Sequence, residues 1–464
     1  MSITFKQTNP LFLREVDAPQ VPLGAEDYLR RLALLRAGMA ARGLDFCLIY
    51  GDREHFANLD YLSGYDCRFE EGLFLVPAAG APTLLLGNEG MAYSYAVPYE
   101  INRVYYRNFS LQGQPRCRTE TLAGIFRDAG IGGESRLGVI GWKYFLTGYD
   151  TADPEHTYDL PHYVMEAVFR VCPPERVVNA TDLLTGLEGG VRLNVRTARE
   201  IAAAEAAAAR TCNAVLRMLR AVKPGMTEYE VSQRAGIGFA PWCMYPMVNF
   251  GPEHVALGLC SPSDDTALRL GDPCGLCYGV RGSLSSRVGV AAWDRESMGE
   301  YAPLLESFYG KFFEALCAWY GALSIGVTGH TLHRAVHDII GAPEYNVHLN
   351  VGHYIGGDEW VNSPVWEGSE HRLADGAYFQ TDIIASESGP VRTAICEDPV
   401  ILAGPELRGA LAAEYPQVYG RVMARREAMA ELGIKLHDEV LPLSNLNGAM
   451  FPFMLNLDTV FAVE

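Results

Sequence analysis

The chain has 464 residues, of which 49% are hydrophobic and 20% charged, so it is long enough for two or three domains with ample cores. Its net charge of −18 argues against nucleic acid or an anionic membrane as a partner, because phosphate binding needs clustered Lys and Arg. No apolar run reaches the roughly 18 residues that span a bilayer.

The N-terminal sequence and the cysteines both bear on the compartment. MSITFKQTNPLFLREVD has no basic segment followed by an apolar one, so we expect no secretion signal. The 11 cysteines follow no small-scaffold spacing. We therefore expect free, mostly buried thiols in a cytoplasmic protein.

The first part of the chain predicts an α/β domain. Residues 1–24 are polar and contain Pro, which favours an extended arm. Residues 28–42 are apolar at helical spacing and end at Gly43. Buried strands are indicated by DFCLIYG, by a meander over 58–87, and by SRLGVIG. We assign residues 1–180 to this domain.

The second domain is assigned to residues 190–464. An Ala-rich segment, 196–222, predicts a long helix that Lys223-Pro224-Gly225 ends. Gly-rich strands follow over 249–292, and a helical region follows over 301–340. A last helix over 407–433 precedes a Pro-rich tail.

Three chemically capable side chains lie between Leu349 and Glu397. His353 is on a Gly-rich loop (LNVGHYIGGDEW), Asp382 is in an apolar strand (AYFQTDII) and Glu397 is in a second one (AICEDPVIL). Turn signals between these runs let antiparallel strands fold back, so we expect the three groups in one pocket. A charge in an apolar strand is costly unless it is paired, which predicts a partner or a ligand for each acid.

Several segments together resemble the creatinase/aminopeptidase P/prolidase family. They are VKPGMTEYEV, LRLGD, NVGHYIGGDEW, LADGAYFQTD, the Glu of CEDPVIL and the tail EVLPLSNLNGAMFPF, in this order, after an N-terminal domain with GDREHFANLDYLSGY. The resemblance covers nearly the whole chain. It implies an α+β architecture: a pita-bread catalytic domain behind a smaller α/β N-terminal domain.

The peptidase branch of that family binds two divalent ions with two Asp, one His and two Glu. Carried over, the His is His353, the two Glu are Asp382 and Glu397, and the first Asp is Cys277. The second Asp falls on Leu284, counted back from Arg287. Two ions share bridging carboxylates, and Leu cannot ligate, so the departure argues against a two-ion site.

One metal ion on Cys277, His353, Asp382 and Glu397 remains chemically possible, and a thiolate ligand shifts the preference towards Zn²⁺. Cys274 and Cys277 form a CxxC, but it stands alone, so core thiols are the better interpretation. We expect no cofactor.

The creatinase branch uses no metal and employs a His as general acid and base. By its distance from Gly271-Asp272, that His falls on Cys260. A different loop path could bring His254 into the pocket instead. Cys260 could serve as a nucleophile if a neighbouring His lowered its pKa, or it could be a small buried residue.

Two further residues are substrate-binding candidates, with Cys277 as a third. Arg68 could reach a substrate carboxylate from a neighbouring subunit, as N-terminal domains of this family do in dimers, or it could be a surface Arg. Trp360 stands where peptidases often carry a second His, and an aromatic wall suits a cation. Core packing is the alternative for Trp360.

Two carboxylates in a pocket without metal repel each other, and a cationic group relieves them. The leading hypothesis is therefore a homodimeric, metal-independent hydrolase of a C–N bond in a small guanidino or amide compound, acting through His353, Asp382 and Glu397. A metal-dependent Xaa-Pro peptidase with degenerate ligands is the second hypothesis. A non-catalytic binding protein on the same fold is the third.

Overall fold

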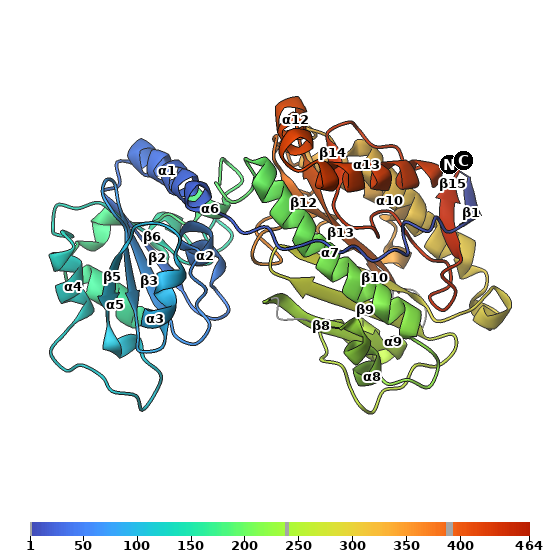
Figure 1. Ribbon diagram of the computed structural model, residues 1–464, viewed down its shortest axis with the longest axis horizontal. Helices are drawn as coiled ribbons and strands as arrows, with labels where there is room; N and C mark the ends of the chain where they lie inside the picture. The colour runs from blue at the N-terminus through green and yellow to red at the C-terminus, as the bar shows by residue number, and fades with distance from the viewer. Residues whose placement is uncertain (1, 237–240, 387–392) are drawn as a thin grey trace. The chain divides into compact units, whose positions relative to one another are not determined.

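The computed structural model describes residues 2–236, 241–386 and 393–464 (Figure 1). Two compact units make up the chain. One contains residues 23–192, and the other combines residues 1–22 with residues 193–464. No helix within the described ranges combines the length and the apolar character needed to cross a membrane.

The unit of residues 23–192 is built on a six-stranded sheet of order β5-β4-β3-β2-β6-β7. Its strands are β2 (Phe46–Gly51), β3 (Gly72–Pro77), β4 (Thr83–Leu86), β5 (Asn102–Tyr105), β6 (Leu137–Ile140) and β7 (Val177–Asn179). β2, β3 and β4 pair antiparallel, whereas β4–β5, β2–β6 and β6–β7 are parallel. The strands read as near-continuous apolar runs because both faces of the sheet are covered.

Helices lie on both faces of this sheet. They are α1 (Ala25–Arg42), α2 (Ala57–Ser63), α3 (Gly90–Tyr93), α4 (Leu122–Asp128), α5 (His162–Phe169) and α6 (Asp182–Thr185). Successive residues of β2 point to opposite faces of the sheet and belong to two hydrophobic cores. Ile49 is in the core that contains Leu35 of α1, and Leu48 is in the core that contains Phe126 of α4. The expected α/β domain is therefore present.

The other unit contains a seven-stranded sheet of order β11-β12-β13-β10-β9-β8, with β14 pairing to β13. Its strands are β8 (Trp242–Phe250), β9 (Pro273–Val280), β10 (Ser283–Val290), β11 (His353–Tyr354), β12 (Tyr378–Ser386), β13 (Thr393–Leu402) and β14 (Val440–Pro442). Every pairing is antiparallel. β9 and β10 are joined by the two residues Arg281 and Gly282, so no long loop separates them.

The helices of this unit include one long helix that packs on β9 and β10 (Figure 1). They are α7 (Ala198–Ala221), α8 (Glu228–Ser232), α9 (Gly251–Leu257), the π-helical turn η7 (Leu305–Gly310), α10 (Lys311–Ala322), α11 (Gly329–Ile340), α12 (Pro405–Glu414) and α13 (Pro416–Glu431). Thr197 caps α7 by accepting a hydrogen bond from the Glu200 amide at 3.2 Å. Buried Ala side chains let α7 approach the sheet closely.

Local chemistry divides the predicted last helix in two. The sequence predicts one helix over 407–433, but the structure ends α12 at Glu414 and starts α13 at Pro416. Tyr415 has φ −132° and ψ 60°, outside the helical region. Proline disfavours the helical conformation in the residue before it, which explains the break.

The expected domain limits are corrected at the N-terminus. Residues 1–22 belong with the second unit, because β1 (Ile3–Gln7) pairs antiparallel with β15 (Thr459–Val463) at the other end of the chain. The boundary between the units lies between Arg192 and Leu193. A sequence pattern cannot reveal this pairing, because its two strands are separated by almost the whole chain.

Candidate functional site

Four neighbouring strands bring the candidate residues into one row. Cys277 of β9 is in register with Ser286 of β10, which is in register with Glu397 of β13, which is in register with Asp382 of β12. His353 of β11 pairs with Gln380, two residues from Asp382. Directly opposed residues in antiparallel strands point to the same face. The sheet therefore gathers His353, Asp382, Glu397 and Cys277.

This row lies on the face opposite α7. The Thr211 hydroxyl of α7 lies 3.0 Å from the Ser283 hydroxyl and 3.4 Å from that of Ser285, so these two residues face the helix. The Ser285 hydroxyl donates to the Asp398 carboxylate. Since side chains alternate along a strand, Ser286 and Glu397 face away from α7. α7 covers one side of the sheet and leaves the other for the candidate site.

The loop of residues 355–361, which follows β11, folds back over His353. The Tyr354 amide donates to the Asn362 carbonyl at 2.7 Å, and the Val361 amide donates to the Tyr354 carbonyl at 2.9 Å. This bridge folds residues 355–361 back, so that Trp360 stacks on the His353 ring with centroids 4.2 Å apart and planes at 17°. The same loop places Glu359 Oε1 3.1 Å from His353 Nε2.

Gly352 allows the close packing in front of His353. Its φ is +138°, and a Cβ there would lie 2.8 Å from the Phe379 ring. Both the backbone conformation and the space exclude a larger residue. The sequence NVGHY therefore fixes where the imidazole enters the site.

His353 is fully buried and carries two different contacts. Its Nδ1 lies 3.1 Å from the Tyr354 carbonyl, which can only accept, so Nδ1 holds a hydrogen. Its Nε2 faces Glu359 at 3.1 Å and Asp382 at 3.8 Å. Neither contact has hydrogen-bond alignment, so Nε2 is buried without a hydrogen-bond partner. Burial lowers the pKa of His353, but the Glu359 and Asp382 charges outweigh it and raise the pKa overall.

The acids of the row hold their protons more tightly than ordinary carboxyls. Burial raises the pKa of Asp382 to about 7, with the His353 charge opposing and Glu359 adding to the rise. Burial also raises the pKa of Glu397 well above its usual range, and Asp382 and Glu359 add to this rise. The pKa of the Cys277 thiol is raised by burial and then by Glu397. Burial, which penalises the charged form, is the main cause of all three shifts, and neighbouring acids add to it.

Arg287 of β10 is paired on the other face of the sheet. Arg287 forms a buried ion pair with Asp398 and also donates to the Ala449 and Leu446 carbonyls. Burial lowers the pKa of Arg287, but the Asp398 charge outweighs it and raises the pKa overall. Arg287 therefore anchors the C-terminal tail. Its charge lowers the pKa of Glu397, but burial and the neighbouring acids outweigh it.

The donor set does not fit the two-ion site that the sequence resemblance implies. Counting back from Arg287, the resemblance puts the second Asp position on Leu284, whereas the register puts Ser286 opposite Cys277 and Glu397. The short turn between β9 and β10 accounts for this difference. Neither a hydrocarbon nor a neutral hydroxyl can replace a bridging carboxylate. Within the described ranges, no group of three or more His, Cys, Asp and Glu is arranged to hold a metal ion.

The CxxC pair is part of the core. Cys274 and Cys277 lie three residues apart on β9 and so point to opposite faces. Both are buried free thiols, as are most of the cysteines. The expectation of free, mostly buried thiols is confirmed, and Cys277 alone of this pair faces the site.

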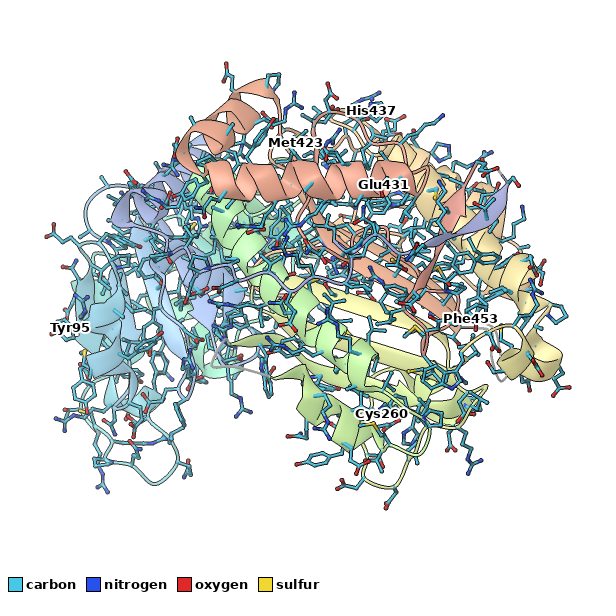
Figure 2. The ribbon with its side chains drawn as sticks, turned by 45° about the vertical axis from the view of Figure 1, so that its right-hand side comes forward. Tyr95, Cys260, Met423, Glu431, His437 and Phe453 are labelled. Carbon is cyan, nitrogen blue, oxygen red and sulfur yellow. The ribbon has the colours of Figure 1, made fainter. Side chains whose placement is uncertain are left out.

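The structure does not bring His254 or Cys260 into the row. His254 Nδ1 lies 2.9 Å from the buried Glu228 carboxylate, which also accepts from the Phe250 and Ser263 amides. Cys260 is partly exposed beyond α9, and its carbonyl accepts from Asn249 (Figure 2). No contact described for either residue involves His353, Asp382 or Glu397. α9 turns both residues towards their own local partners.

Arg68 belongs to the unit of residues 23–192. Its guanidinium lies 2.8 Å from the Asp66 carboxylate, and its side chain is half-exposed. This local ion pair orients the Arg on its own unit. The proposed contact with a substrate in a neighbouring subunit stays a prediction.

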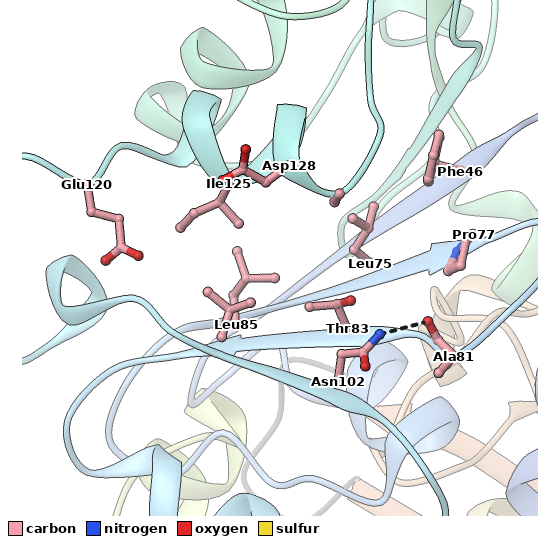
Figure 3. Close-up of a pocket in the computed structure, with 12 residues that line it drawn as sticks. Phe46, Leu75, Pro77, Ala81, Thr83, Leu85, Asn102, Glu120, Ile125 and Asp128 are labelled. Carbon is pink, nitrogen blue, oxygen red and sulfur yellow. Dashed lines mark hydrogen bonds between the residues drawn. The ribbon is translucent and has the colours of Figure 1, made fainter.

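The same unit has a groove of about 450 Å³ between its sheet and α4 (Figure 3). Leu75 and Leu85 of the sheet and Ile125 of α4 give it an apolar lining, and Glu120 and Asp128 bring carboxylates to it. Its lining contains no His, Cys or Ser. The groove therefore offers mainly apolar contact and negative charge.

Sequence reasoning missed Glu359, Gln380 and Ser286. Glu359 was inside a motif that we recognised, but its position depends on the loop closed by Tyr354 and Asn362. Gln380 precedes Asp382 by two residues, and this period-two spacing could have identified it. Ser286 emerges only from strand register.

Two family models match the sequence. Residues 202–392 match the metallopeptidase family M24 model, and residues 31–147 match the creatinase/prolidase N-terminal domain model. The search of curated proteins gave no significant match.

Solved structures with the same fold include three dipeptidases or prolidases. Dipeptidase PepE from Mycobacterium ulcerans is 22% identical, with TM-score 0.62 over 82% of this chain and 94% of that chain. The Xaa-Pro dipeptidase from Bacillus anthracis is 18% identical, with TM-score 0.61 over 82% and 96%. The prolidase from Thermococcus sibiricus is 17% identical, with TM-score 0.63 over 91% and 98%. These similarities confirm the fold.

Proposed function

Because this chain joins a creatinase/prolidase N-terminal domain to a metallopeptidase family M24 domain of pita-bread fold, we propose that it is a hydrolase whose site acts on a small organic cation without metal. The bond cleaved is a C–N bond of a guanidino, amidino or amide group. This proposal keeps the fold of the peptidases and assigns a different role to the acids of the row.

The observation that carries the proposal is an array of buried acceptors without donors. Gln380 Oε1 and Asp382 Oδ1 have no hydrogen-bond partner in the described part of the chain. The Gln380 amide nitrogen donates to the Leu284 carbonyl, which fixes the side chain so that its oxygen is the free atom. Both residues lie on one face of β12, with Glu397 opposite Asp382. A planar guanidinium or amidinium supplies several N–H donors and one positive charge to such acceptors.

Binding a cation also relieves the charge on the row. Asp382 and Glu397 ionise reluctantly because they are buried and adjacent. A cation between them stabilises both carboxylates, which is the physical reason for preferring a positively charged substrate. Trp360, stacked on His353, supplies an aromatic surface beside that position.

The reaction then needs one water molecule and one proton carrier. The water oxygen forms a bond to the amidino or amide carbon, the C–N bond breaks, and one water proton ends on the leaving nitrogen. The cluster of His353 and its acidic neighbours provides the carrier, since a proton can be exchanged near neutral pH where an imidazole and carboxylates lie together. The cation-binding acids keep the carbon electrophilic by retaining the charge on the substrate.

A metal-dependent Xaa-Pro dipeptidase is the second candidate, and the similarity to solved dipeptidases favours it. The available metal ligands argue against a dipeptidase, because neither Leu284 nor Ser286 supplies the carboxylate that would bridge two ions. A single ion on Cys277, His353, Asp382 and Glu397 would need these side chains to rearrange.

The test is an assay of purified protein, with and without EDTA, on guanidino compounds, amides and Xaa-Pro dipeptides. We expect hydrolysis of a cationic C–N compound at the same rate in both conditions. Loss of activity on chelation, restored by Mn²⁺ or Zn²⁺ together with dipeptide cleavage, would establish the peptidase instead. Thermal stabilisation by guanidino compounds without turnover would favour the non-catalytic binding protein.

The proposal includes a cytoplasmic homodimer. Buried free thiols suit a reducing compartment, and aromatic side chains such as Phe69, Tyr95 and Tyr149 are largely exposed in a single chain. Light scattering coupled to gel filtration should give twice the 51.0 kDa mass of one chain. A mass of 51.0 kDa at micromolar concentration would exclude the dimer.

A further inference from the structure

Glu359 occupies a central position among the groups of the site. Its carboxylate lies 3.1 Å from His353 Nε2. It also acts electrostatically on Asp382, Glu397 and Cys277, which belong to three different strands. One side chain of the 355–361 loop therefore contacts the imidazole that borders the row.

Glu359 is also more accessible than the two titratable side chains closest to it, His353 and Asp382. Its side chain is 19% exposed, against 0% for His353 and 7% for Asp382. The His353 ring is covered by Trp360 on one face and held at Nδ1 by the Tyr354 carbonyl. A ligand that enters the site therefore meets Glu359 before it meets His353.

Resting on the proposed function above, we propose that Glu359 is the group that exchanges a proton with the substrate and water, and that His353 acts behind it. As the water oxygen bonds to carbon, Glu359 takes one water proton. As the C–N bond breaks, Glu359 gives that proton to the leaving nitrogen and returns to its starting state. His353 is then a positioning residue, which holds the carboxylate in place and stabilises its charge.

The contact geometry suits a carrier that moves between two positions. The Glu359–His353 pair is at ion-pair distance but lacks hydrogen-bond alignment. A small rotation of the Glu359 side chain can align it with His353 or turn it towards a ligand on Asp382. Asp382 and Glu397 lie directly in the sheet, with side chains shorter or more deeply buried, and suit binding better than transfer.

The experiment compares Glu359→Gln, Glu359→Asp and the wild-type protein on the guanidino or amide compound that the wild type hydrolyses fastest. Glu359→Gln keeps the shape and a polar contact but cannot carry the proton. We expect kcat to fall by roughly 10²–10⁴-fold, with KM within about threefold, the size typical of general acid–base catalysis. Glu359→Asp should recover part of kcat. In a third variant, Glu359→Ala, added formate should partly restore kcat by replacing the missing carboxylate.

The matched control is Glu367→Gln, an exposed Glu on the following loop, which should leave kcat and KM unchanged. If the wild type is active and Glu359→Gln keeps kcat within threefold, the inference is overturned and the proposed function stands. If Glu359→Gln raises KM alone, or formate has no effect, Glu359 binds or folds the loop and does not transfer a proton. If the wild type hydrolyses none of the compounds, the proposed function fails and this inference fails with it.

Discussion

At the scale of single residues, the site differs from a two-ion centre by a few atoms. Cys277 and Ser286 stand opposite each other and in line with Glu397 and Asp382. Aspartates at such positions would bring enough negative charge to hold divalent ions. A thiol and a hydroxyl bring none. Burial still raises the pKa of both Asp382 and Glu397, and His353 and Arg287 oppose that rise only in part. Cys277 and Ser286 therefore change what the row of side chains can bind, without changing the sheet that builds it.

The raised pKa of Asp382 predicts a pH dependence of stability. The pKa is about 7 in the folded protein and 3.8 ordinarily, so the folded state binds this proton more tightly than the unfolded chain. The stabilisation of the folded state by the proton on Asp382 is fully present below about pH 4. It is lost as the pH rises towards 7. The raised pKa of His353 has the same sign, because protonation is favoured in the folded state.

We therefore expect the melting temperature of wild-type protein to fall between about pH 5 and about pH 8, and this fall to be smaller in Asp382→Asn. Thermal unfolding in a series of buffers at constant ionic strength measures both profiles. Asp264→Asn, at an exposed position, is the control and should follow the wild type. Parallel profiles for wild type and Asp382→Asn would contradict the assignment of the shift to Asp382.

At the scale of elements, one ion pair ties two strands to the tail. Arg287 of β10 meets Asp398 of β13 and also donates to the carbonyls of Leu446 and Ala449. Both charged side chains are almost completely buried. The pair fixes the register between β10 and β13, and this register brings Ser286 to Glu397.

Replacing Arg287 by Met should destabilise the fold strongly, because it leaves Asp398 charged and unpaired in the core. The expected loss is about 3–5 kcal/mol of unfolding free energy. Urea denaturation measures it. Arg295→Met is the matched control, since Arg295 pairs with Glu306 on the surface and should cost less than about 1 kcal/mol. Equal losses in the two variants would show that Asp398 finds other compensation.

At the scale of the whole molecule, the chain closes on itself. Residues 3–7 form the strand that pairs with residues 459–463, and Phe5 packs against Phe461 with ring centroids 5.4 Å apart. The N-terminal arm thus stabilises the domain that carries the site, although the creatinase/prolidase N-terminal domain follows it directly in sequence.

Deleting residues 2–7 should therefore lower the stability of the site-bearing unit by a few kcal/mol, since each lost hydrogen bond contributes about 1 kcal/mol. Differential scanning calorimetry measures the change in transition temperature. Lys6→Ala keeps the strand pairing and removes only the exposed contact to the Glu431 carbonyl, so it should change little. An unaltered transition in the deletion variant would mean that β15 does not need β1.

The sequence by itself determined the fold class, the two-domain organisation and the three groups His353, Asp382 and Glu397. These follow from local periodicity, from turn signals and from the order of short motifs, all of which are written along the chain. It also identified Cys277 and Leu284 as departures from an ion-binding set.

Only the tertiary structure decided which side chains complete the site. Strand register put Ser286 rather than Leu284 in the row, and a loop closed by Tyr354 and Asn362 delivered Glu359 to His353. His254 contacts Glu228 and does not join the row. Register, loop closure and ion pairing depend on residues far apart in the chain, so their outcome cannot be read from spacing along the sequence.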